Sequence, residues 1–174
     1  MSGINQPVQD AINEQIKNEF YSAYIYLAMS AHFEAESLLG FASWMRGQAR
    51  EEVTHAMKLF DYVNDRGGRV VLHAIEAPPT RFASPLEIFR QALAHEREVT
   101  AMIHRLYALA AQESDYPTQV ALQWFVTEQV EEEKTAADIV AQLEMVGDNR
   151  TALLLMDREM AGRRAQDEAA GGEA

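Results

Sequence analysis

Hydrophobic residues recur at alternating steps of three and four along four long stretches of the chain. This spacing is typical of amphipathic helices that pack against one another in a bundle. The pattern predicts helices over residues 7–35, 39–66, 85–112 and 117–147. Two glycines follow the second stretch, and Ser84-Pro85-Leu86-Glu87 has the form of a capping box with proline in the first turn.

The lengths of the connections predict how these helices are arranged. Short links join the first helix to the second and the third to the fourth, so each pair is expected to form an antiparallel hairpin. The long segment between the pairs contains a Pro-Pro sequence that no helix continues through, and it can run the length of the bundle. We therefore predict an all-α four-helix bundle with one long crossover, in a single domain over residues 1–162. A shorter fifth helix is predicted from about Thr151, and a disordered tail over 163–174.

The inward-facing positions are apolar at both ends of the bundle and polar in its middle. The polar residues there are Glu19, Glu52, His55, Glu96 and Glu132. Each glutamate lies a similar number of residues from its hairpin turn, and a helix rises about 1.5 Å per residue. Four carboxylates and one imidazole are therefore expected to meet in one internal layer.

Buried carboxylates at one level repel one another, and a fold tolerates them only if protons or cations neutralise them. No lysine or arginine occupies the central inward-facing positions, which favours a metal ion. Oxygen ligands with a single imidazole suit iron or manganese better than a closed zinc site. A lone Glu-x-x-His pair would be weak evidence for a metal site, but here all four helices place a glutamate at the same level of the bundle.

A second acidic set flanks this layer and includes Glu51, Glu128, Glu131 and Glu133. Glu128 and Glu132 lie four residues apart on one helix, where like charges repel unless a cation sits between them. From the residues alone, a solvated acidic face is the better interpretation of this set. The remaining histidines are predicted to be ordinary surface residues: His32, His73, His95 and His104.

Composition narrows the possible functions. The 174 residues include no cysteine, which excludes disulfides, zinc ribbons and thiol catalysis. The formal net charge of −12 argues against nucleic acid as a partner and is compatible with attracting cations. No apolar run approaches the length of a membrane span and the N-terminus is unlike a signal peptide, so we expect a cytoplasmic protein with no membrane partner.

Over residues 5–162 the chain resembles the ferritins, and more closely the non-haem bacterial ferritins. The resemblance rests on the segments EQIKNEFYSAYIYLAMS, AREEVTHAMKLFDYVNDRGG, WFVTEQVEEE and TALLLMDREMAG. It implies the ferritin-like bundle with a short fifth helix. It also implies a homo-oligomeric shell of twenty-four subunits, with the fifth helices at the four-fold axes.

The resemblance also implies a di-iron ferroxidase centre. Glu19, Glu52 and His55 would bind the first iron, and Glu96 and Glu132 the second, with Glu52 bridging the two. Gln129 stands where the family often places a glutamine beside the second iron.

Two further sets of residues match positions with a role in the family. Tyr26 matches a tyrosine thought to supply an electron during oxidation. Glu51, Glu128, Glu131 and Glu132 fall where bacterial ferritins bind a third iron, which favours a functional role for these acids.

Differences from neighbouring families exclude other cofactors. Bacterioferritins repeat Glu-x-x-His on the fourth helix, but here Thr135 follows Glu132. They bind haem through a methionine next to the bridging glutamate, where this chain has Val53, so haem is not expected. Rubrerythrins need cysteine pairs, and the small starvation-induced relatives lack the fifth helix.

The resemblance implies an iron-storage protein that oxidises ferrous iron with dioxygen or hydrogen peroxide and stores the ferric product. The alternative is a non-catalytic helical oligomer whose buried acids bind a structural divalent ion. Aerobic addition of ferrous iron distinguishes the two, because only the first oxidises iron faster than buffer does.

Overall fold

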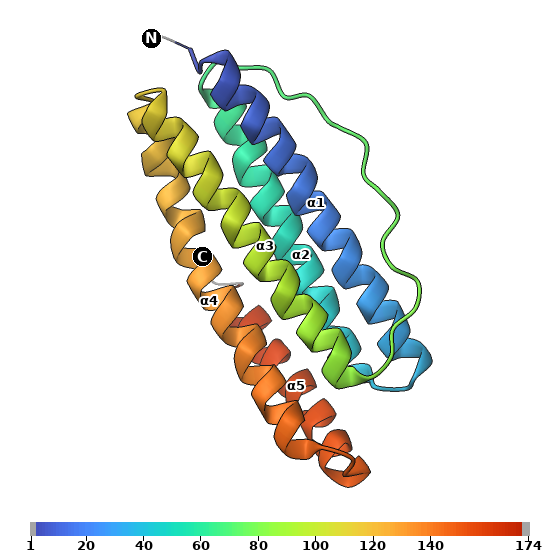
Figure 1. The fold of residues 1–174 in the computed structure, drawn as a ribbon. Helices are drawn as coiled ribbons and strands as arrows, with labels where there is room; N and C mark the ends of the chain where they lie inside the picture. The colour runs from blue at the N-terminus through green and yellow to red at the C-terminus, as the bar shows by residue number, and fades with distance from the viewer. Residues whose placement is uncertain (1–2, 172–174) are drawn as a thin grey trace.

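The computed structural model describes residues 3–171, and their side chains as far as residue 162. Every regular element in this part is an α-helix: α1 (Gln6–Ala35), α2 (Leu39–Asp65), α3 (Pro85–Gln112), α4 (Tyr116–Val146) and α5 (Arg150–Gly171). Helices α1 to α4 form an elongated bundle, and the crossover between α2 and α3 runs along its outside beside α1 (Figure 1). The predicted fold class and topology are confirmed.

Side-chain caps define where three of the helices begin. Asn5 Oδ1 accepts the Val8 N–H at 3.1 Å, and Ser84 Oγ accepts the Glu87 N–H at 3.2 Å as the capping-box pattern predicted. Asp115 Oδ1 accepts the Thr118 N–H at 3.2 Å. The α1 and α4 helices each begin one residue before the predicted start, because proline and its preceding residue fit the first helical turn, and α5 also begins one residue early, at Arg150.

Two apolar clusters fill the bundle on either side of the polar layer. One lies towards the α1–α2 turn and is built around Phe33, Phe41 and Phe89, with ring centroids 5.3 to 6.0 Å apart. The other lies towards the opposite end and includes Ile12 and Ile103. The division leaves the middle of the bundle to polar side chains, as the sequence pattern predicted.

Side chains of α1 fasten the crossover to the bundle. Asn13 acts like a backbone group, since its Nδ2 donates to the Arg69 carbonyl at 3.1 Å and its Oδ1 accepts the Val71 N–H at 3.2 Å. Gln9 Oε1 accepts the Arg69 N–H at 2.8 Å. These bonds keep an extended segment parallel to α1 without a β-sheet partner.

Helix α5 packs directly on the first turn of α2. Asp157 Oδ1 accepts the Phe41 N–H at 2.8 Å, so a side chain of α5 caps α2. A Cβ atom on Gly40 would lie 1.6 Å from the Asp157 carbonyl oxygen, so only glycine permits this approach. Helix α5 extends to Gly171, through a segment rich in alanine, arginine, glutamine and glutamate, and the predicted disorder of residues 163–174 stays a prediction. Residues 172–174 lie outside the described part.

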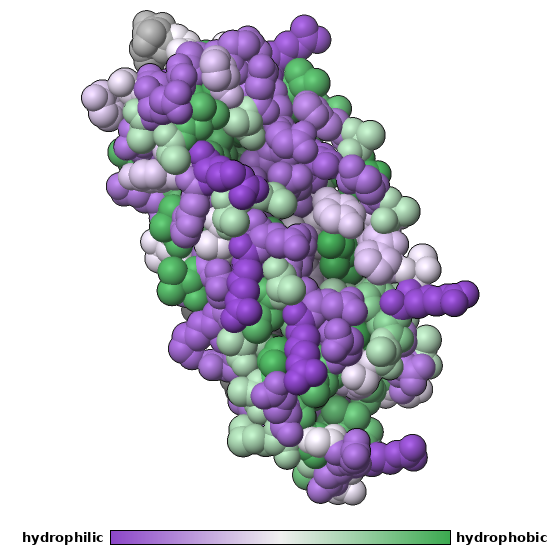
Figure 2. Space-filling view, in the orientation of Figure 1, coloured by the Kyte–Doolittle hydropathy of each residue, from purple (hydrophilic) through white to green (hydrophobic). Residues whose placement is uncertain are grey.

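The surface carries several large apolar side chains among its polar ones, as the face drawn in Figure 2 shows. They include Tyr24 and Leu27 on α1, Leu72 on the crossover, and Leu154 and Leu155 on α5, each at least 46% exposed. No described helix is long and apolar enough to cross a membrane. Single exposed apolar side chains are common on protein surfaces, whereas a contiguous patch of them is typical of a contact with another protein chain.

Candidate metal centre

Helices α1 and α2 bring together the first three predicted ligands. One ligand atom each of Glu19, Glu52 and His55 lies within 4.8 Å of the others. Their side chains are buried, with exposed fractions of 1%, 2% and 4%. Glu52 and His55 share a face of α2 because they stand three residues apart, and His55 Nδ1 lies 3.4 Å from Glu52 Oε2.

Two oxygens in this group have no hydrogen-bond partner. Glu19 Oε2 and Glu52 Oε2 are both buried and unsatisfied. The other oxygen of Glu19 is held by Gln15, whose Nε2 donates to it at 2.8 Å. A buried carboxylate oxygen without a donor is costly, and a bound cation would satisfy both oxygens at once.

Helices α3 and α4 supply the other two glutamates. Glu96 is fully buried; Tyr26 donates its phenolic hydrogen to Glu96 Oε1, and Gln129 Nε2 donates to Oε2 at 3.2 Å. Glu132 is only partly buried and accepts from Gln48 Nε2 at 2.8 Å. The polar layer therefore opens towards the side of Glu132.

Burial is the main cause of the electrostatic state of this layer. It raises the pKa of Glu19 to about 7 and that of Glu132 to about 8. It also holds the pKa of Glu52 well above its ordinary value, and the charges of Glu19 and Glu96 raise it further. Burial lowers the pKa of His55 to about 4, so this imidazole is neutral near pH 7 and free to bind a metal. The donor set and its protonation fit a cation site.

The flanking acids form a second group that shares a residue with the first. Ligand atoms of His55, Glu128 and Glu132 lie within 4.8 Å of one another. Burial raises the pKa of Glu128, and the charges of Glu131 and Glu51 add to the effect. The four acids predicted from the resemblance for a third iron therefore act on one another electrostatically.

Glu133 does not belong to either group. Its Oε1 accepts the hydroxyl of Thr100 at 2.6 Å, and its Oε2 lies 3.8 Å from Arg97 Nε. It therefore faces α3.

His95 corrects one prediction from the sequence. It was expected to be an ordinary surface residue, but it is half-buried, and its Nε2 lies 2.7 Å from Ser22 Oγ. Its ring also packs edge-on against Tyr26, with centroids 6.5 Å apart. The position is off the inward-facing seam of α3 and is covered because α1 packs against α3 at this level.

Sequence reasoning also missed the groups that hold the predicted ligands. Gln15 and Gln48 orient Glu19 and Glu132, and Trp124 packs edge-on against His55 with centroids 5.2 Å apart. Gln48 stands at an inward-facing position of α2, so helical periodicity could have identified it. Gln15 lies four residues before Glu19, where a helix places neighbours.

Comparison with known proteins shows which family the chain belongs to. Residues 9–146 match the ferritin-like domain family. The chain belongs to the ferritin family. A bacterial non-heme ferritin of Staphylococcus epidermidis is 43% identical over 153 residues, which cover 88% of this chain and 92% of that protein. One of Staphylococcus aureus is 38% identical over 165 residues, 95% of this chain and 99% of the relative.

Solved ferritin structures agree with the fold. The open pore ferritin of the archaeon Archaeoglobus fulgidus superposes with a TM-score of 0.91 at 48% identity, covering 92% of this chain and 98% of that one. A closed form engineered from the same archaeal ferritin gives 0.90 at 49% identity. Family membership across nearly the whole chain, together with the Glu/His groups, supports iron storage as the function.

Proposed function

We propose that this ferritin oxidises ferrous iron at a paired site within one subunit and stores the ferric product inside a homo-oligomeric shell. The observation that carries the proposal is the pair of unsatisfied, buried oxygens of Glu19 and Glu52 beside a neutral His55. A stable protein retains such atoms only where something positive binds to them. Ferrous iron is the substrate that membership of the ferritin family indicates.

In this proposal Glu19, Glu52 and His55 bind one ferrous ion, and Glu96 and Glu132 bind the second. Glu52 would bridge the two, a role supported by the charges of Glu19, Glu96 and Glu132, which all act on it. Gln129 stands beside the second ion, where it already contacts Glu96. Each iron gives up one electron, and one dioxygen or hydrogen peroxide molecule accepts both.

The chain's own groups prepare the site for this reaction. Carboxyl groups with raised pKa values are partly protonated near pH 7, so metal binding releases their protons to solvent. Gln15 and Gln48 hold Glu19 and Glu132 by one oxygen each, which leaves the second oxygen for a cation. Hard carboxylate oxygens bind ferric more strongly than ferrous iron, so this ligand set favours the oxidised product.

Tyr26 is proposed as an additional electron donor. It is buried, its ring packs edge-on against Trp44 at 6.4 Å, and its hydroxyl donates to Glu96. Dioxygen can accept four electrons, so after the two irons have given one each, Tyr26 and a third iron would each give it one more, and the phenolic proton of Tyr26 would pass along this bond to Glu96. The geometry supports such a transfer because no water needs to enter the buried layer.

A third iron is proposed to bind among Glu51, Glu128, Glu131 and Glu132, since ligand atoms of Glu128 and Glu132 lie within 4.8 Å of each other and the charges of Glu51 and Glu131 act on Glu128. Haem is not proposed, because Val53 offers no ligand at the position where bacterioferritins use methionine. The exposed apolar residues of α1, the crossover and α5 support a homo-oligomer, which we propose to be the family's twenty-four-subunit shell. The cytoplasmic location stays a prediction.

Aerobic addition of ferrous iron tests the proposal. With two ferrous ions per subunit, absorbance near 300 nm should rise within seconds, far faster than in buffer alone. A rate equal to that of buffer would support the alternative, a helical oligomer with a structural divalent site. Sedimentation with iron analysis then shows whether the oxidised metal remains inside an assembled particle.

A further inference from the structure

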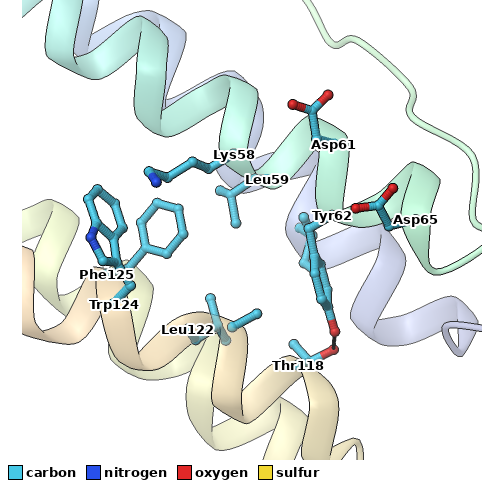
Figure 3. A pocket seen from close by; sticks show the side chains of 11 residues that line it. Lys58, Leu59, Asp61, Tyr62, Asp65, Thr118, Leu122, Trp124 and Phe125 are labelled. Atoms are coloured by element: carbon cyan, nitrogen blue, oxygen red, sulfur yellow. Dashed lines mark hydrogen bonds between the residues drawn. The ribbon is translucent and has the colours of Figure 1, made fainter. Parts of the chain in front are cut away.

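The ammonium group of Lys58 on α2 lies over the ring of Trp124 on α4. Its Nζ is 4.4 Å from the ring centroid, a cation–π contact that joins the two helices (Figure 3). Trp124 also packs edge-on against His55, with centroids 5.2 Å apart at an interplanar angle of 75°. A positive charge therefore lies near a predicted metal ligand.

Lys58 stands one helical turn from the second acidic group. His55 and Lys58 are three residues apart on α2, and Trp124 and Glu128 are four apart on α4. Residues at these spacings are neighbours on one face of a helix. The contact between Lys58 and Trp124 thus forms the next layer of the bundle after His55 and Glu128.

The charge of Lys58 acts on both members of that layer. Burial is the main reason for the low pKa of His55, and Lys58 lowers it further. Burial and neighbouring acids raise the pKa of Glu128, and Lys58 opposes them. The ring contact with Trp124 and the helical spacing place the ammonium group about one turn from Glu128, and so from a cation bound there.

The surroundings of Lys58 support its apolar stem and leave the residue exposed at the surface. It lies at the rim of a cavity of about 360 Å³ between α2 and α4, with a floor that includes Leu59, Leu122 and Phe125 (Figure 3). The apolar stem of lysine can lie along such a floor while its charged end remains at the rim. Lysine is a flexible point charge, suited to moving when a cation arrives.

We propose that Lys58 sets the affinity of the third cation position, by competing with the metal for the negative charge of Glu128. This inference rests on the metal site proposed above. An ammonium one turn away partly neutralises the acids without ligating anything, so a divalent ion at the third position is held weakly. Iron then passes through this position instead of remaining there.

The two tight positions should share less of this effect, although His55, a ligand of the first, also lies one turn from Lys58. They lie deeper in the bundle, among Glu19, Glu52 and Glu96, which are 0 to 2% exposed. Lys58 is exposed and interacts with the outer edge of the layer. Its influence is therefore expected to fall mainly on the site that includes Glu128.

Anaerobic calorimetric titration of the assembled, metal-free protein with Zn²⁺ tests the inference. Zinc is redox-inert, so binding is measured without oxidation. The third step is identified as the one that Glu128→Gln removes. Lys58→Gln should raise the zinc affinity of that step about tenfold. This is the effect expected from one unit charge on a divalent ion about a helical turn away in a water-like dielectric. This increase in affinity should be smaller at high salt, because dissolved ions screen the charge of Lys58.

Two variants make the result specific. Lys58→Arg keeps the charge and the ring contact, so its third step should match the wild type. Lys17→Gln removes the same charge from the far side of α1, where Lys17 pairs with Glu14 and Glu76, and should change nothing. An unchanged third step in Lys58→Gln, or equal strengthening of all steps, would overturn the inference. Absence of any tight step in the wild type would instead overturn the proposed function.

Discussion

Tyr26 on α1 donates a hydrogen bond to Glu96 on α3, so the candidate electron donor contacts a predicted iron ligand directly. Tyr26→Phe removes the hydroxyl and keeps the packed ring. We expect both ferrous ions to bind as in the wild type, while the first turnover slows several-fold and no tyrosyl radical appears by electron paramagnetic resonance after freeze-quenching. A wild-type rate, or an undiminished radical in the variant, would contradict the role of Tyr26.

The raised pKa values of Glu19 and Glu132 make the stability of the metal-free protein depend on pH. Their folded-state pKa values are about 7 and about 8, above the ordinary 4.5, so the folded state binds more protons than the unfolded state between these values. The stability that these two groups contribute is therefore fully present below about pH 4.5 and is lost as the pH rises through about 7 and 8. The melting temperature of the metal-free protein should be lower at pH 8 than at pH 5.5.

The double variant Glu19→Gln/Glu132→Gln is the control for this pH dependence. Its amides cannot ionise, so its melting temperature should change less between the two pH values. A melting temperature that rises with pH in the wild type, or an equal fall in both proteins, would show that other groups dominate.

The close approach of α5 to α2 depends on Gly40. Because a Cβ atom there would lie 1.6 Å from the backbone oxygen of Asp157, Gly40→Ala must push α5 away and weaken the Asp157 cap on Phe41. We expect a loss of about 1–3 kcal/mol, the usual cost of overpacking, measured by chemical denaturation with sedimentation to follow assembly. Gly162→Ala is the matched control, since nothing lies within 4 Å of its Cβ position.

Haem should be absent from the protein purified from cells that make haem. Val53 is exposed on α2 and has no atom that can ligate iron. The absorbance spectrum should show no Soret band. A band at stoichiometric intensity would place the chain with the haem-binding members of the family.

Much of the candidate site could be predicted from sequence, because the positions of Glu19, Glu52, Glu96 and Glu132 follow from helical periodicity and the lengths of the hairpins. These depend on local geometry that every α-helix shares. His95 could not be placed, since its burial depends on how α1 and α3 are rotated against each other.

The contact of Lys58 with Trp124 is equally hidden from the sequence, because it joins helices that are not neighbours in the chain. The docking of α5 depends on a close approach at Gly40, and a glycine in a helix can equally reflect other causes. Contacts between residues far apart in the sequence therefore determine the features that helical periodicity does not predict.

The role of Glu52 as the bridge between two irons is the central claim, and stopped-flow oxidation of Glu52→Ala tests it most directly. Losing the bridge weakens both ions and their mutual position, which a shared two-electron reaction requires. The metal-free shell should survive, since Glu52 is one of several mutually repelling buried carboxylates. At about two irons per subunit, the account predicts loss of the fast phase in a variant that sedimentation shows to be assembled. An assembled variant that oxidises iron at the wild-type initial rate would contradict it.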